Sequence, residues 1–166
     1  MEAAPSVSPA RVEDVPAVQS IAERTWKATY ADLIPGEVQA RLLATWYSTA
    51  ALEGQIRAGE TIFLVARWEE EPVGFAQFVR LSSAEAALLR IYVLPEFQNR
   101  SVGSALLSAG LAKLRERGIG KLTVEVEREN RIGRRFYRQR SFTDVGESIA
   151  DFAGHEVALV KCELAI

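Results

Sequence analysis

Few residues in this chain could build a metal centre, a disulfide or a nucleophilic triad. Cys162 is the only cysteine among 166 residues, which excludes an internal disulfide, and it lies in an alternating apolar run, 157–164, typical of a packed strand. His155 is the only histidine, which argues against a histidine-rich zinc site and against a Ser/His/Asp triad. We therefore expect no metal cofactor.

Net charge and long apolar segments are scarce as well. The formal net charge is −2, which gives no whole-protein attraction to nucleic acid or to an anionic membrane. No apolar run approaches the ~18 residues of a membrane span, and no basic segment followed by a long apolar run opens the chain. These absences predict a cytoplasmic protein that binds neither nucleic acid nor a membrane.

The chain is long enough for one stable core. With 166 residues, of which 48% are hydrophobic, it can bury about two thirds of its unfolded surface. No linker, repeat or low-complexity tract interrupts the sequence, so we predict a single domain over 1–166, with residues 1–5 as a loose start.

Hydrophobic periodicity and turn residues predict an alternation of helices and strands. Helices are expected from 13 onward, over 37–46, over 50–57, from 102 to a stop at Gly118 and Gly120, and over 131–140. Strands are expected over 7–12, 61–66, 73–81, 87–93 and 122–126, with a charged turn at 69–72. A closing hairpin, 142–146 and 156–164, is expected to have a long connection. This order indicates an α/β (α+β) fold with a mixed sheet.

The segment 91–107 carries the strongest local signal. It reads as an apolar strand, a short loop and a helix that begins near Val102. The first N–H groups of a helix lack intrahelical partners and the helix dipole adds partial positive charge, so such a junction binds phosphate through main chain. Arg100 supplies charge, and Gly103 lacks the Cβ that would keep a ligand from the backbone. An ordinary strand–loop–helix connection is the alternative for this segment alone.

A second segment, 130–142, follows a predicted strand, and in order and spacing the two segments resemble the GNAT superfamily of acetyl-CoA-dependent N-acetyltransferases. The family's first loop reads Q/R-x-x-G-x-G/A, and its later motif reads N-x-x-A-x-x-F/L-Y-x-x-x-G-F. The chain matches them at Gln98, Arg100, Val102, Gly103, Asn130, Phe136, Tyr137 and Phe142. It departs from them at Ser101 and Ser141, which replace glycines, and at Gly133, which replaces alanine.

Ser101 is the departure with the clearest consequence. If this position needs a positive φ, serine costs roughly 1 kcal/mol or more. If the position needs only close approach, the hydroxyl of Ser101 can itself donate to a phosphate oxygen.

The resemblance covers nearly the whole chain and implies a fold and a cofactor. The fold is a central mixed, mostly antiparallel sheet of about seven strands with helices on both faces and a splay between strands 4 and 5. The splay would admit the pantetheine arm of acetyl-CoA, which pairs with strand 4 as an added strand would. The residues that would bind this cosubstrate are Ile91, Tyr92, Val93, Gln98, Asn99, Arg100, Ser101, Val102, Gly103, Ser104, Asn130 and Tyr137.

Arginines crowd the second segment, with Arg131, Arg134, Arg135, Arg138 and Arg140 within ten residues. On a helix, several of them share a face. They suit the phosphates of a polyanionic cofactor, and a solvated helix face is the equal alternative. Nucleic acid is the weaker explanation, because no aromatic stacking platform accompanies the arginines.

Transfer of an acetyl group to an amine requires a base, an oxyanion donor and a proton for the leaving thiolate. An alkyl amine with a pKa near ~10.4 is mostly protonated at pH 7. By resemblance, Glu125 in Glu125-Val126…Asn130 corresponds to the proposed base of the bacterial ribosomal-protein N-terminal acetyltransferases, and a solvent-facing glutamate is the equal alternative for this residue. Asp32 and Glu96 are the other candidates for the base. The N–H of Val93 would hold the oxyanion. Tyr137 would protonate the thiolate, directly or through water.

The sequence gives weaker evidence for the residues that bind the acceptor. Trp26-Lys27-Ala28-Thr29-Tyr30 is similar to the W-x-x-T-Y run of the PaiA-type spermidine/spermine acetyltransferases, so Trp26, Tyr30 and Asp32 are the candidates to flank an ammonium group. Packing residues are the alternative. The resemblance implies an N-acetyltransferase that acts on a small amine, polyamine or protein N-terminus. A non-catalytic acyl-CoA-binding sensor is the second hypothesis, and a homodimer stays open.

Overall fold

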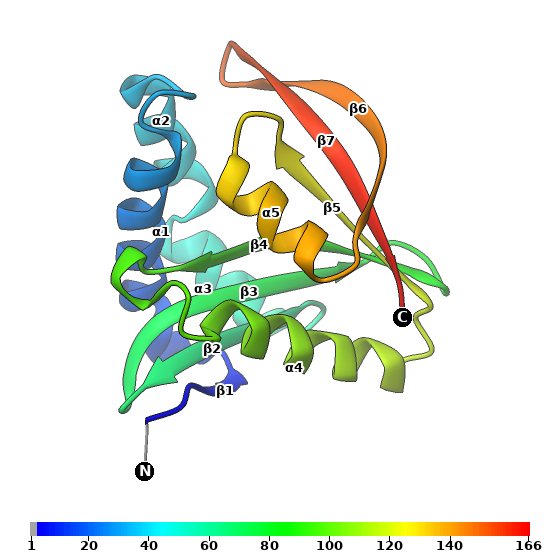
Figure 1. The fold of residues 1–166 in the computed structure, drawn as a ribbon. Helices are drawn as coiled ribbons and strands as arrows, with labels where there is room; N and C mark the ends of the chain where they lie inside the picture. Colours follow the sequence, from blue (N-terminus) through cyan, green and yellow to red (C-terminus); the bar gives the residue numbers. More distant parts are fainter. Residues whose placement is uncertain (1–2) are drawn as a thin grey trace.

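One seven-stranded sheet organises the computed structural model, which describes residues 3–166. The strands are β1 (Ser6–Pro9), β2 (Ile62–Trp68), β3 (Glu71–Arg80), β4 (Glu85–Val93), β5 (Lys121–Glu127), β6 (Thr143–Phe152) and β7 (His155–Ala165). The helices are α1 (Val15–Tyr30), α2 (Gly36–Trp46), α3 (Thr49–Ala58), α4 (Val102–Glu116) and α5 (Arg131–Gln139), with 3-10 turns η1 (Val12–Asp14) and η2 (Pro95–Phe97). Figure 1 shows their arrangement.

The strand order is β1-β2-β3-β4-β5-β7-β6. Every neighbouring pair is antiparallel except β4 and β5, which are parallel. The predicted mixed, mostly antiparallel sheet is therefore confirmed. No helix within residues 3–166 is long and apolar enough to cross a membrane.

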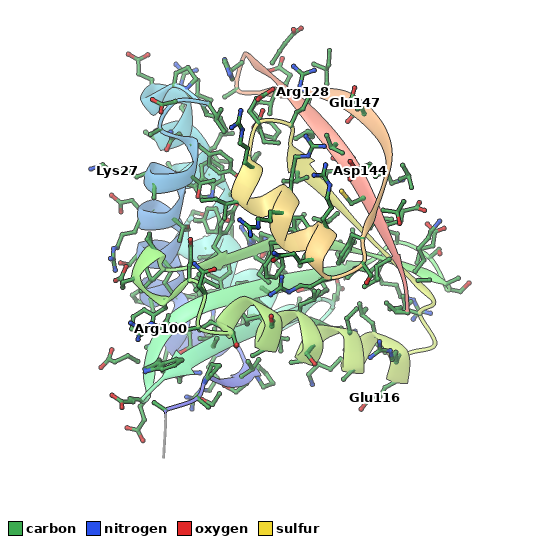
Figure 2. All side chains as sticks on the ribbon, in the orientation of Figure 1. Lys27, Arg100, Glu116, Arg128, Asp144 and Glu147 are labelled. Carbon is green, nitrogen blue, oxygen red and sulfur yellow. The ribbon has the colours of Figure 1, made fainter. Side chains whose placement is uncertain are left out.

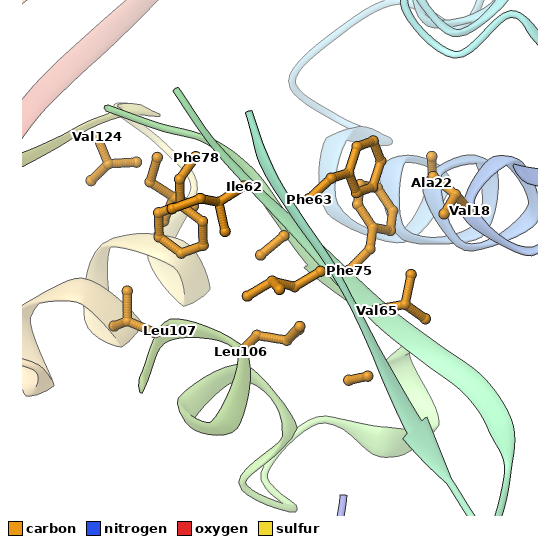
Figure 3. Close-up of a cluster of buried hydrophobic side chains, with 14 of the residues drawn as sticks. Val18, Ala22, Ile62, Phe63, Val65, Phe75, Phe78, Leu106, Leu107 and Val124 are labelled. Atoms are coloured by element: carbon orange, nitrogen blue, oxygen red, sulfur yellow. The ribbon is translucent and has the colours of Figure 1, made fainter. Parts of the chain in front are cut away.

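Helices cover both faces of the sheet, and their apolar sides form the core. On one face, Val18 and Ala22 of α1 pack against the face that presents Phe63 and Phe75 (Figure 3). On the other face, α4 presents Leu106 and Leu107 towards the sheet beside Phe78 (Figure 3). Because alternate residues of a strand point to opposite faces, the same strand, β3, contributes Phe75 to the apolar layer under α1 and Phe78 to the apolar layer under α4.

The parallel pair β4 and β5 diverges along its length. Their pairing runs only from Glu85 opposite Lys121 to Leu88 opposite Val124. Beyond that point, residues 89–93 of β4 have no partner on the β5 side, and α5 lies over the divergence (Figure 1). The splay implied by the family resemblance is therefore present.

A bulge in β4 sits at the start of this divergence. Gln77 pairs with Arg90, whereas the next residue of β3, Phe78, pairs with Leu88, so Leu89 is the extra residue. A bulge of this kind changes which face a side chain points to. As a result, Leu88 faces α4 together with Phe78, and Arg90 faces the side covered by α1, α2 and α3.

Three expected boundaries differ in the structure. The closing hairpin has no long connection: β6 runs on to Phe152 and joins β7 through Ala153 and Gly154, with φ values of 51° and 88°. The pattern hid this strand because β6 forms the outer edge of the sheet and has almost no buried face. The charged turn contains only Glu69 and Glu70, because Glu71 already begins β3.

The first strand ends at Pro9 rather than at residue 12, where a 3-10 turn leads into α1. Of the predicted loose start 1–5, residues 1–2 lie outside the described residues, and residues 3–5 belong to no helix or strand.

Candidate active site

A pocket of about 450 Å³ lies where β4 and β5 diverge. Two walls enclose it. The α4–α5 wall consists of the loop 98–101, the first turn of α4, and α5; the α1 wall consists of the end of α1 and the side chains that β4 and β5 present to that helix. The lining includes these predicted site residues: Tyr30, Ile91, Tyr92, Val93, Gln98, Asn99, Ser101, Val102, Gly103, Ser104, Glu125, Asn130 and Tyr137.

The main chain of β4 is open towards the pocket. The N–H of Leu94 donates to the carbonyl of Val73 on β3, at 2.9 Å. In an antiparallel ladder, residues alternate between those bonded to the partner and those that point away, so the N–H and C=O of Val93 face the gap. The side-chain amide of Gln98 donates to that Val93 carbonyl at 3.1 Å, which fixes the loop to the strand. The N–H of Val93 is left facing the pocket.

The first turn of α4 supplies further main-chain donors. The first α-helical bond of α4 runs from the N–H of Ala105 to the carbonyl of Ser101, at 3.0 Å. The N–H groups of residues 102–104 consequently have no carbonyl partner within the helix, and all three residues line the pocket. This end of α4 is therefore suited to an anion.

The loop before α4 holds two non-glycine residues in the left-handed region. Asn99 has a φ of 62° and Ser101 a φ of 64°. Serine thus occupies a position for which glycine is the low-energy choice. Ser141, the second serine at a usual glycine position, has a φ of 69°.

Gly103 is also required by packing. A Cβ at this position would lie 2.8 Å from Cε2 of Phe136 on α5. The ring of Phe136 is itself held by Arg140, whose guanidinium carbon lies 3.7 Å from its centroid. Gly103 therefore lets α4 and α5 approach, which forms the α4–α5 wall.

The arginines of the second segment divide between the pocket and the opposite side of α5. Arg135 and Arg140 line the pocket. Arg140 donates to the hydroxyl of Ser104 and, at 3.0 Å, to the carbonyl of Phe136, and burial lowers its pKa. Arg134 and Arg138 instead pair with Asp144 of β6.

Arg140 was absent from the predicted site residues, although the arginine cluster pointed to it. Conversely, Arg100 does not line the pocket. Its guanidinium lies 5.7 Å from the ring of Trp68 and 5.6 Å from that of Phe97, at the outer side of the loop (Figure 2). Arg140, directly after α5, therefore places a charge beside Ser104 in the first turn of α4.

Tyr137 of α5 is buried between both walls, with 8% of its surface exposed. Its ring packs edge-on against Phe136 and Phe142, at centroid distances of 5.3 Å. Burial raises the pKa of the phenol well above its ordinary value. Tyr137 consequently keeps its proton from neutral to alkaline pH.

On the α1 wall, the hydroxyls of Tyr30 and Tyr92 lie 3.2 Å apart. Burial raises the pKa of both phenols. Trp26 does not reach the pocket: it is 3% exposed and contacts the rings of Tyr30, Trp46, Tyr47 and Tyr92. Asp32 is exposed in the turn after α1 and does not line the pocket either. Of the three predicted acceptor residues, only Tyr30 lies in the pocket.

Among the acidic candidates for the base, only Glu125 lines the pocket. Its strand neighbour Val124 points to the same side of the sheet as Phe78 (Figure 3), which is the α4 face, so Glu125 points to the α1 wall. Glu96 instead forms an ion pair with Arg24, at 2.6 Å, which lowers its pKa. Within residues 3–166, no group of three His, Cys, Asp or Glu residues is arranged to hold a metal ion.

Pocket residues that the sequence did not single out include Thr25 of α1 and Leu89 and Arg90 of β4. None of them belongs to a local motif. Leu89 and Arg90 lie in the bulge-forming stretch before Ile91, and hydrophobic periodicity cannot show to which face of the sheet each of them points.

Comparison with known proteins agrees with this geometry. The chain is 27% identical over 145 residues to a spermidine N(1)-acetyltransferase of Thermoplasma acidophilum, covering 85% of this chain and 89% of that protein.

Solved structures share the fold. The PaiA N-acetyltransferase of Thermoplasma acidophilum, solved with coenzyme A, superposes with a TM-score of 0.82 at 24% identity, over 98% of this chain and 99% of that one. The ribosomal-protein-S18-alanine N-acetyltransferase of Escherichia coli superposes with a TM-score of 0.73 at 19% identity, over 98% and 94%. The model of the acetyltransferase (GNAT) family matches residues 18–142, and the chain is therefore a member of the GNAT family of N-acetyltransferases.

Proposed function

We propose that this enzyme transfers the acetyl group of acetyl-CoA to a primary amine by direct attack of the amine on the thioester. The observation that carries the proposal is the meeting, in one pocket, of the open β4 edge, the free amides of α4 and the protonated Tyr137. The spermidine acetyltransferase and the alanine acetyltransferase among the relatives support a small amine, a polyamine or a protein N-terminus as acceptor.

The α4–α5 wall fits the phosphates of CoA. Three free N–H groups at residues 102–104 point from a helix N-terminus, and Arg140 lies beside Ser104 without a carboxylate partner within 4 Å among the described residues. A guanidinium and backbone amides together match phosphate oxygens. The open edge at residues 91–93 suits the amides of the pantetheine arm, which would add to β4 as a strand does.

The chemistry is assigned to three groups. Glu125 takes the proton of the bound ammonium, directly or through water, because the neutral amine is the nucleophile. The N–H of Val93 stabilises the negative charge that develops on the thioester oxygen as the C–N bond forms. Tyr137 donates its proton to the sulfur as the C–S bond breaks, and the second proton of the attacking nitrogen passes through water to the Tyr137 phenolate, which leaves a neutral amide and free CoA.

Binding and turnover test the proposal separately. Titration with acetyl-CoA is expected to give a dissociation constant in the micromolar range, and a screen of primary amines is expected to release free thiol. Binding without turnover on any amine would favour the acyl-CoA sensor over the enzyme, and no binding would overturn the proposed pocket.

A further inference from the structure

Arg90 is a cation on the α1 wall without a counter-ion. It lines the pocket and is only partly exposed, yet none of the ion pairs among residues 3–166 includes it. A half-buried charge is stable when it is paired or well hydrogen-bonded. Arg90 has hydrogen bonds, but all of them go to neutral groups.

Those hydrogen bonds hold the guanidinium in one orientation. Its Nε donates to Oε1 of Gln77 at 2.8 Å, one Nη to Oε1 of Gln55 at 3.0 Å, and the other Nη to the carbonyl of Trp46 at 3.3 Å. Gln77 is 1% exposed and also donates to Gln55, so the acceptors are fixed as well. The ring of Tyr47 lies 4.4 Å from the guanidinium carbon and forms its floor.

Two donors of Arg90 remain, because a guanidinium has five N–H groups and three are used. One remains on each terminal nitrogen, which is the arrangement that accepts a carboxylate through two parallel hydrogen bonds. The hydrogen bonds that orient the guanidinium exist before a ligand binds, so the site is preorganised for an oxyanion.

The position of Arg90 relates this oxyanion site to the reacting amine. The bulge at Leu89 turns Arg90 to the same face as Tyr92, the α1 wall, whereas the cofactor groups lie on the α4–α5 wall. Arg90 and Val93 are three residues apart on β4, a backbone separation of about 10 Å at ~3.3 Å per residue, which is on the scale of one short acceptor molecule.

We propose that Arg90 binds a carboxylate of the acceptor, so that the substrate is an amine that carries a carboxylate about three to five methylene groups from the reacting nitrogen. This inference rests on the proposed N-acetyltransferase function and narrows its acceptor class. Glu125 on the facing strand would attract the ammonium end of such a substrate, and Arg90 the anionic end. A second ammonium group in place of the carboxylate would meet a fixed like charge, which disfavours diamines and polyamines.

Matched acceptors of equal length provide the test. Free-thiol release is measured with 4-aminobutanoate, 5-aminopentanoate and 6-aminohexanoate, with their carboxamides, and with the diamines of the same length. For the best length, the carboxylate is expected to exceed the carboxamide in kcat/KM by about tenfold or more, the ratio that corresponds to ~1.4 kcal/mol for a charged hydrogen-bonded pair. The diamine is expected to be poorer still.

Substitutions of Arg90 test whether the preference for carboxylates over carboxamides depends on this residue. In Arg90→Gln, the ratio of kcat/KM for the carboxylate to kcat/KM for the carboxamide should fall towards one, through a rise in KM for the carboxylate. Arg90→Lys should keep part of this ratio, because lysine retains the charge but not the two parallel N–H donors of a guanidinium. Arg41→Gln, an exposed arginine of α2 outside the pocket, should keep the wild-type ratio. Melting temperatures identify any variant that fails to fold. If Arg90→Gln does not fold, the carboxylate-to-carboxamide ratio of Arg90→Lys is the deciding measurement.

Four outcomes are distinct. A wild-type preference for carboxylates that Arg90→Gln abolishes supports the inference. Acetylation of carboxamides or diamines with no preference for carboxylates overturns it and leaves the proposed function standing. An equal loss for all acceptors in Arg90→Gln assigns Arg90 a structural role and also overturns it. If no amine is acetylated and 5-aminopentanoate does not shift the melting temperature of the wild-type protein with CoA, both proposals fail.

Discussion

The two walls of the pocket differ in how their chemistry is built. The α4–α5 wall offers main-chain N–H groups, which are fixed by the helix itself, together with arginines from a single short helix. The α1 wall offers side chains only, namely the Tyr30–Tyr92 pair, Arg90 and Glu125, and these come from three separate segments. Main chain at a helix end recognises any phosphate, whereas the side chains of the α1 wall can discriminate between acceptors.

This contrast separates two kinds of experimental constant. Changes in the α4–α5 wall should alter the dissociation constant of CoA, whereas changes in the α1 wall should alter KM and kcat for the amine. Tyr137 belongs to α5, but its proposed role is to give a proton to the leaving sulfur, so removal of its hydroxyl should affect turnover alone. The following substitutions test that division, from the largest expected effect to the smallest.

Tyr137→Phe should lower kcat by about 10²-fold or more, because the thiolate loses its proton donor while the packing of the ring against Phe136 and Phe142 is kept. The dissociation constant of CoA should stay within about twofold, the pattern of an interaction made in the transition state. Since burial raises the pKa of Tyr137, the wild-type enzyme should also show no loss of kcat from pH 7 to about 10. Equal turnover in the variant would mean that water protonates the thiolate.

Gly103→Val should disrupt the α4–α5 wall, because even a Cβ would lie 2.8 Å from the ring of Phe136. We expect a destabilisation of about 1–3 kcal/mol from overpacking and a weaker affinity for CoA, measured by denaturant unfolding and by titration. Phe136→Leu, combined with Gly103→Val, provides the matched control, since a smaller side chain should recover part of both losses. Without such recovery, the role of Gly103 would lie in ligand access instead.

The same contrast explains which parts of the site the sequence reveals. The α4–α5 wall lies in two contiguous segments, and most of the residues predicted for it, such as Gln98, Ser104 and Tyr137, line one pocket, because helix starts and turns leave a local pattern in the sequence. Even there, Gly103 was assigned to ligand approach, although its contact is with a ring 33 positions away in the chain. Packing between distant segments has no local pattern.

The positions of the side chains in the α1 wall depend on tertiary structure rather than on local sequence. Arg90 points into it because Leu89 forms a bulge and because Gln55 and Gln77 hold the guanidinium. Trp26 was a candidate for the acceptor site, yet it packs in the core, since an aromatic residue on an amphipathic helix looks the same in both roles. The presence and order along the chain of the helices and strands were more accessible, because hydrophobic period and turn residues indicate them directly.

Glu125→Gln should lower kcat/KM by about tenfold near neutral pH and recover as the pH rises towards ~10.4, where solution supplies the neutral amine. The affinity for CoA should not change, because Glu125 belongs to the α1 wall. Glu147→Gln, an exposed glutamate of β6 outside the pocket (Figure 2), is the matched control and should keep the wild-type profile. A uniform deficit at every pH would assign Glu125 to substrate positioning, and no deficit would leave the proton to ordered water.

Ser101→Gly and Ser141→Gly should both stabilise the protein, because serine has a φ of 64° and 69° at these positions. Relief of about 1–2 kcal/mol of left-handed strain exceeds the ~0.5–1 kcal/mol that glycine loses in backbone entropy, so each variant should gain about 0.5–1 kcal/mol in denaturant unfolding. Only Ser101 lines the pocket, and Ser141 is therefore its control. If the amides of residues 102–104 carry the phosphate contact, both variants should bind CoA within about threefold of wild type, which is below ~1 kcal/mol. A tenfold loss confined to Ser101→Gly would instead show that the hydroxyl of this serine contacts the cofactor, and that the α4–α5 wall relies on a side chain where the family motif has none.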